Sequence, residues 1–140
     1  MIIRVTACVL TALFALVTFS GCGGSGLPSV TGMVTIDGQP APEGLQISFQ
    51  PDVPNSSTSL GITDASGNYE MKFNPSISGV MAGTSKVRVW VPRKMGAEGI
   101  PAIPSQLKGI KIPREFNEDT TLTFEVQNGS NTFDIDIPSK

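Results

Sequence analysis

The sequence predicts an all-β protein whose strands pack as a two-sheet sandwich. Short segments alternate apolar and polar side chains, which is typical of strands with one buried and one exposed face. The chain also contains 15 glycines and 11 prolines, which separate these segments as turn-forming residues do in all-β domains. Beyond the first 21 residues, no segment keeps the 3.6-residue apolar period of a helix. Because each strand has one apolar face, two sheets must pack together to bury it.

Seven strands are expected along the chain. They cover residues 30–36, 45–50, 60–63, 69–73, 87–91, 121–126 and 133–137. The last strand has the clearest pattern, since Phe133, Ile135 and Ile137 share one face. Asp134 and Asp136 alternate with them, so we expect these two carboxylates to point outward.

Turn-forming residues connect the expected strands. The Asp-Gly pair at 37–38 and the Asn-Gly pair at 128–129 accept the positive φ angles that tight turns between antiparallel strands require. The segment 64–68 serves the same purpose between the third and fourth strands, and we expect Gly67 to have a positive φ there.

The first 21 residues have the layout of a secretory signal peptide. A positively charged start ends at Arg4, an apolar run covers residues 5–19, and small residues follow up to Cys22. The apolar run is shorter than the roughly 20 residues that a transmembrane helix needs, so a signal peptide is favoured. Removal of this segment would change the net charge from −2 to −3.

The end of this segment resembles the lipobox of bacterial lipoproteins. In that family, signal peptidase cuts before the cysteine, which then carries diacylglycerol and an acyl chain such as palmitate. The resemblance implies a signal peptide at 1–21, a lipidated Cys22 and a flexible tether at 22–29. Phe19 departs from the usual aliphatic residue, which leaves secretion without a lipid as the alternative. Gly23 after the cysteine implies the outer membrane.

Three further segments resemble the carboxypeptidase regulatory-like domain. They are 32–40 (GMVTIDGQP), 45–49 (LQISF) and 63–69 (TDASGNY). The resemblance implies a transthyretin-like (prealbumin-like) sandwich of seven strands over residues 30–138, with Tyr69 plugging the core. The segment 112–117 also resembles one that recurs in small bacterial lipoproteins with this domain.

The residue types favour a protein without catalytic activity. The chain has no histidine, which is the commonest general base and the commonest metal ligand. Hydrolases and dioxygenases of similar fold depend on histidines that are missing here, so we expect no catalytic residue, metal or cofactor. A small hydrolase or transferase on a transthyretin-like scaffold is the alternative. An isopeptide-linked adhesin is disfavoured, because the first lysine, Lys72, lies well beyond the first strand.

Asp64, Ser66 and Asn68 alternate oxygens like the start of a calcium loop, but the glycine falls at the fourth position instead of the sixth. Pro75 occupies the twelfth position, where such a loop needs a glutamate. A structural turn is therefore favoured.

The segment 92–119 is far longer than most connections between strands, and long loops are often functional. We favour a structural interpretation, in which its apolar residues fold back over one end of the sandwich and Pro113 starts a helical turn that seats Phe116. The alternative is a binding loop for a protein or an anionic polymer. Its candidate contact residues are Trp90, Arg93, Lys94, Lys108 and Lys111.

The sequence as a whole therefore predicts a non-catalytic, lipid-anchored module of the cell envelope. Its expected partners are the membrane, through Cys22, and an envelope protein or polysaccharide of unknown identity. No nucleic acid is expected, because the chain has no basic run and a negative net charge.

Overall fold

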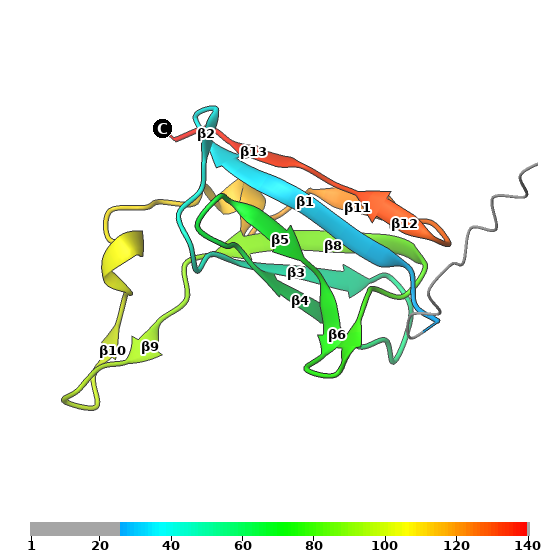
Figure 1. The fold of residues 1–140 in the computed structure, drawn as a ribbon, viewed down its shortest axis with the longest axis horizontal. Helices are drawn as coiled ribbons and strands as arrows, with labels where there is room; N and C mark the ends of the chain where they lie inside the picture. Colours follow the sequence, from blue (N-terminus) through cyan, green and yellow to red (C-terminus); the bar gives the residue numbers. More distant parts are fainter. Residues whose placement is uncertain (1–25, 140) are drawn as a thin grey trace, which may run out of the picture.

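The computed structural model describes residues 26–139 of the chain. These residues form two β-sheets that face each other (Figure 1), so the predicted all-β sandwich is confirmed. The signal segment 1–21 and Cys22 lie outside the described residues. Within the described part, no helix reaches the length and hydropathy that a membrane span needs.

Thirteen strands and two 3-10 helices follow each other along the described residues. They are β1 (Ser29–Ile36), β2 (Gln39–Pro40), β3 (Gln46–Pro51), β4 (Ser59–Ile62), β5 (Asn68–Glu70), β6 (Lys72–Asn74), β7 (Ile77–Ser78), β8 (Gly83–Trp90), β9 (Lys94–Met95), β10 (Pro101–Ala102), η1 (Ser105–Leu107), η2 (Arg114–Phe116), β11 (Thr123–Val126), β12 (Ser130–Thr132) and β13 (Ile135–Ile137). Each expected strand corresponds to one or two of these, and the remaining strands have two or three residues each.

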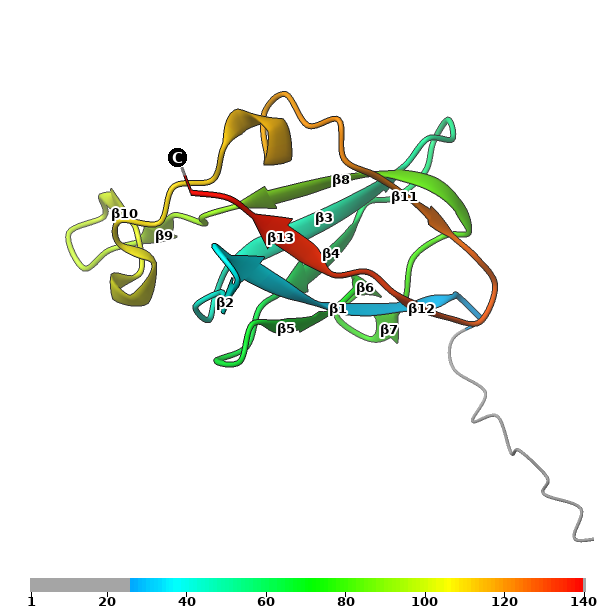
Figure 2. The same ribbon diagram turned by 90° about the horizontal axis from the view of Figure 1, so that it is seen from above.

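Strand β1 is the centre of the first sheet. It pairs antiparallel with β2 and β5 on one side, and parallel with β12 and β13 on the other (Figure 2). Val34 lies opposite Ile135 in this register. Gly32 lies opposite Tyr69, and a Cβ atom at this glycine would lie 1.9 Å from the carbonyl oxygen of Phe133. Position 32 therefore has no room for a side chain.

The second sheet has the strand order β11-β8-β3-β4-β6-β7. Its centre is the antiparallel pair of β3 and β8, in which Ile47 lies opposite Val89 and Phe49 lies opposite Val87. All four side chains are fully buried. The alternation that predicted these two strands therefore places their apolar faces against the first sheet.

One of the expected strands is divided in the structure, and another begins two residues later than expected. The segment 69–73 divides at Met71, where the chain leaves the first sheet as β5 and joins the second as β6. Met71 is fully buried at this crossing, and its N–H donates to Val30. The segment 133–137 begins after β12, and the Asp134 carboxylate accepts a hydrogen bond from the Met33 N–H at 2.9 Å. The acceptor at this point of the sheet is a side chain instead of a backbone carbonyl, so β12 and β13 are separate strands.

Aromatic side chains pack between the two sheets. The Phe49 ring lies 6.1 Å from the rings of Phe124 and Phe133, and the latter two stack at 4.5 Å. Tyr69 is buried, as predicted, and its hydroxyl donates a hydrogen bond to the Phe133 carbonyl. Burial raises the pKa of this hydroxyl well above its usual range, and the negative charge of Asp134 raises it further.

The turn at 64–68 forms as the sequence predicts. Gly67 has a φ of 80°, and the Asp64 carboxylate accepts hydrogen bonds from the N–H groups of Ser66 and Asn68 at 2.8 and 3.0 Å. This carboxylate therefore closes an Asx turn, which supports the structural interpretation over a calcium loop. A Cβ at Gly67 would lie 2.8 Å from the carbonyl oxygen of Val34.

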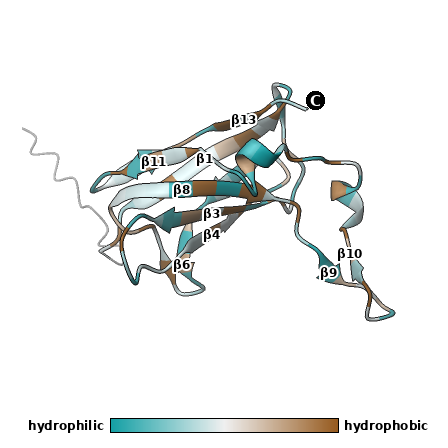
Figure 3. Ribbon diagram, turned by 180° about the vertical axis from the view of Figure 1, so that it is seen from behind, coloured by the Kyte–Doolittle hydropathy of each residue, from teal (hydrophilic) through white to brown (hydrophobic). Residues whose placement is uncertain are grey.

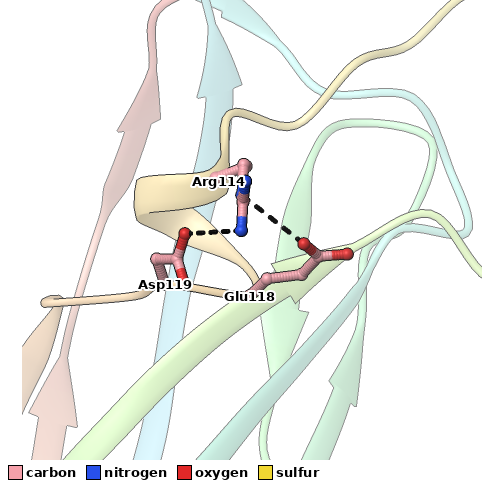
Figure 4. A network of polar contacts seen from close by, with 3 residues as sticks. All are labelled: Arg114, Glu118 and Asp119. Carbon is pink, nitrogen blue, oxygen red and sulfur yellow. Dashed lines mark ion pairs between the residues drawn. The ribbon is translucent and has the colours of Figure 1, made fainter.

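The long segment 92–119 divides into two parts. Its second part folds back onto the sandwich: Leu107 is fully buried, Phe116 packs against the core, and Pro113 is the N-cap of η2. This confirms the predicted helical turn. Arg114 in this turn forms ion pairs with Glu118 at 3.5 Å and Asp119 at 2.9 Å (Figure 4).

The first part of the same segment does not fold back. Strands β9 and β10 pair only with each other and form an arm that stands apart from both sheets (Figure 3). Met95 and Ile100 on this arm and Ile103 just beyond it are exposed, so the prediction that the apolar residues of the segment cover the sandwich is wrong for these three. A two-stranded hairpin has too little surface of its own to bury them.

Candidate functional site

The five contact residues predicted from the sequence all belong to β8 and the segment that follows it. Trp90 is the last residue of β8 and is half-buried. Arg93 and Lys94 stand at the start of the hairpin, Lys108 follows η1, and Lys111 lies between the two 3-10 helices.

The four cations among these residues are exposed. In residues 26–139 the ion pairs are those of Arg114, so none of the four is neutralised by a carboxylate. The structure thus gathers basic side chains along one segment but shows no shared contact that joins all five residues.

The hairpin is held by its own hydrogen bonds. The Gly96 N–H donates to Ile100, and the Gly99 N–H donates to Gly96, both at 3.0 Å. The exposed fraction is 75% for Met95, 63% for Ile100 and 39% for Ile103 just beyond the hairpin. Exposed apolar side chains beside basic residues make this hairpin a candidate contact surface.

A second surface was not predicted from the sequence. A groove with a volume of about 1160 Å³ lies along β1, β4, β5 and β6. Leu60 and Ile62 on β4 line it with exposed fractions of 49% and 58%, and Met33 and Phe73 add apolar surface. This volume is somewhat above the range of about 300–1,000 Å³ for ligand pockets in proteins.

The groove exists because the chain changes sheets beside it. Strand β5 belongs to the first sheet and β4 to the second, and Gly61 of β4 packs against the end of β5. A Cβ on Gly61 would lie 2.8 Å from the sulfur of Met71 and 3.1 Å from the carbonyl oxygen of Glu70. The missing side chain lets the two strands meet, and Leu60 and Ile62 on either side of the glycine remain outside the core.

The rim of the groove is mainly acidic. Asp64, Glu70 and Asp134 line it, and Lys72 is the basic residue among its lining side chains.

The sequence signal that could have indicated the groove is the pattern of Leu60 and Ile62 on either side of a glycine. That pattern predicts a strand but does not show which face of it is buried.

The carboxylates of the described residues do not assemble into a metal-binding group of three or more. The shifted pKa values belong to groups with structural partners. Hydrogen bonds from the Ser139 hydroxyl and N–H lower the pKa of the Asp37 carboxyl, and the Tyr69 hydroxyl is bonded to Phe133. The arrangement at the groove and the hairpin therefore offers apolar and ionic contacts, which suit binding.

No protein-family model matches the sequence, and no curated protein matches it. Among solved structures, the major pilin subunit BcpA of Bacillus cereus is similar with 10% identity and a TM-score of 0.45, over 81% of this chain and 30% of the pilin. A 9R-lipoxygenase from Cyanothece is similar with 11% identity and a TM-score of 0.42, over 81% of this chain and 16% of that one. The chain thus spans less than a third of the length of these proteins, and similarity at this level assigns neither a family nor a function.

Proposed function

We propose that the protein is a non-catalytic, lipid-anchored module of the cell envelope that acts through contacts with a partner. The observation that carries this proposal is the separation between the start of the domain and the hairpin. The Pro28 carbonyl accepts a hydrogen bond from Val80, and the Ser29 N–H donates to Gly129, both at 2.9 Å. Val80 lies just before β8, whereas the hairpin follows the end of β8.

Strand β8 therefore sets the distance between the two ends. It has eight residues, which at about 3.3 Å per residue corresponds to roughly 25 Å. A lipid on Cys22 would hold the domain by the end where Pro28 and Ser29 are bonded. The hairpin, with its exposed apolar and basic side chains, would then face away from the membrane toward a partner (Figure 1).

The finer assignment, a carboxypeptidase regulatory-like domain, is supported by the residues that carry the resemblance. Asp64 and Gly67 form the turn and Tyr69 is buried in the core, as the resemblance implies. The exposed apolar and basic side chains of the hairpin suit a contact with another molecule. An envelope protein or a polysaccharide is the partner class proposed on this ground.

The anchor is tested by membrane fractionation of bacteria that produce the full chain. Wild-type protein should be recovered with the outer membrane, and Cys22→Ser should move to the soluble envelope fraction, because a lipid is the source of durable attachment. Cys8→Ser is the matched control, since it removes a thiol from the predicted signal peptide and should behave as wild type. An intact mass equal to the bare chain from residue 22 would show secretion without a lipid.

A further inference from the structure

The exposed large apolar side chains of the protein gather in two places. Six such residues occur in the described part of the chain. Met95, Ile100 and Ile103 belong to the hairpin and its exit, and Leu60 and Ile62 line the groove. The sixth, Val53, lies in the connection between β3 and β4. Exposed apolar residues that cluster in this way mark interaction sites more often than scattered ones do.

The two places carry opposite charge. The hairpin segment 93–102 contains two cations, Arg93 and Lys94, and one carboxylate, Glu98. The lining of the groove contains three carboxylates and one lysine, as described above. Complementary potentials of this kind steer two surfaces together and fix their orientation.

The hairpin does not fill the groove of its own molecule. Ile100 at its tip and Ile62 in the groove are both more than half exposed in the same structure. The pairing of β9 and β10 involves no other strand in the described residues. The apolar residues of the hairpin thus lack a partner, and the groove of about 1160 Å³ has room for several side chains.

We propose that the hairpin of one copy docks in the groove of a second copy of this chain. This inference rests on the proposed function, because it names the partner of the hairpin that the anchored module presents. The two surfaces are different, so the contact is heterologous: each copy offers a hairpin to one neighbour and a groove to another. Such contacts produce rings or open chains of molecules, here along the membrane surface.

Cysteine cross-linking in cells tests this contact on the full chain. Cys8 lies in the predicted signal peptide and the proposed lipid occupies the thiol of Cys22, so one reactive cysteine can be introduced among residues 23–140 of each copy. One copy carries Ile100→Cys, and a second copy with a larger tag carries Leu60→Cys. After mild oxidation, a non-reducing gel should show the mixed dimer when both copies are present.

The matched control replaces Leu60→Cys with Val53→Cys. Val53 and Leu60 have the same exposed fraction, 49%, but Val53 is not among the residues that line the groove. The control pair and the chain without added cysteine should give no mixed dimer. Equal yields with both partners, or dimers formed by the Ile100→Cys copy alone, would overturn the proposal.

Charge reversal provides a second readout of the same contact. Lys94→Glu on the hairpin copy or Glu70→Lys on the groove copy should each lower the cross-linking yield about tenfold, because like charges then face each other. Combining the two changes should restore the yield. Restoration would not follow from misfolding of either variant, and its absence would contradict the proposed contact between the hairpin and the groove.

The outcomes separate this inference from the proposed function. Suppose that the Cys22→Ser variant leaves the membrane as expected, but the copy with Leu60→Cys is cross-linked to a different protein or to nothing. The proposal of docking between copies is then wrong, and the proposed anchored module stands. If wild-type protein is not lipidated but the mixed dimer still forms between copies that also carry Cys22→Ser, the anchor is wrong and the docking contact stands.

Discussion

Gly67 combines a positive φ with close backbone contacts, and each property has its own cost on substitution. We expect Gly67→Val to lower the free energy of unfolding by more than the roughly 1–2 kcal/mol of left-handed backbone strain, because its Cβ would also meet Val34 and Ala41 at 2.8 and 3.0 Å. Gly109→Val is the matched control, since Gly109 has a φ of 83° with open space around it. Chemical denaturation of both variants measures the difference. An equal loss of unfolding free energy in the two variants would show that the turn at 64–68 adjusts to the side chain at no extra cost.

Tyr69 is the only tyrosine of the chain, so its titration can be followed without overlap. Its pKa in the folded protein is raised above the ordinary value of 10.0. The neutral hydroxyl is therefore favoured by folding, and this contribution is complete below pH 10 and decreases as the pH rises above it.

The phenolate absorbance of folded protein should therefore appear only well above pH 10, or together with unfolding. Tyr69→Phe should remove this part of the pH dependence of the free energy of unfolding. A normal phenolate titration in folded protein would show that the hydroxyl is accessible.

At the scale of elements, the segment 92–119 contains one part that stabilises the fold and one that does not. Leu107 is fully buried, so Leu107→Ala should lower the free energy of unfolding by about 2–5 kcal/mol. A second variant joins Lys94 to Ala102 through an Asn-Gly turn and so lacks the exposed tip, residues 95–101. Its free energy of unfolding should differ from that of the wild type by less than about 0.5 kcal/mol. Denaturation curves compare the two. A large loss in the shortened variant would mean that the hairpin supports the sandwich.

The alternation of side chains was sufficient to predict every long strand, because burial on one face leaves a period of two in the sequence. It could not predict the division at Met71, since Tyr69, Met71 and Phe73 keep the alternation while the chain moves from one sheet to the other. The hairpin was missed for a related reason. Met95 and Ile100 are apolar, and the sequence does not show that nothing covers them.

At the scale of the whole molecule, the two candidate surfaces differ in how far the sequence revealed them. The basic residues around the hairpin could be predicted as contact residues because they lie in the segment 92–119, which is unusually long for a connection between strands. The groove was not visible, because it depends on which strands of different sheets become neighbours. The pattern of Leu60 and Ile62 predicts a strand but not its buried face. In the structure Gly61 packs against Met71, and the side chains of Leu60 and Ile62 are exposed.

The mature protein should unfold in one cooperative transition that neither a chelator nor a reducing agent shifts. The described residues contain no cysteine and no group of carboxylates suited to a metal, so the core rests on apolar packing. Thermal unfolding followed by circular dichroism, with and without EDTA and a thiol reductant, checks this. A lower midpoint with either reagent would reveal a stabilising metal or disulfide.

The position of β1 also has a consequence for the time course of folding. β1 is the first strand of the domain, yet Val34 pairs with Ile135, about a hundred residues later in the chain. During synthesis or export, one edge of β1 therefore stays unpaired until the last strand has emerged. Pairing of residues so far apart in the chain closes a long loop, which slows folding. An open edge invites pairing with other chains in that interval. A chain that stops before Ile135 should accordingly aggregate, although it contains all of the second sheet.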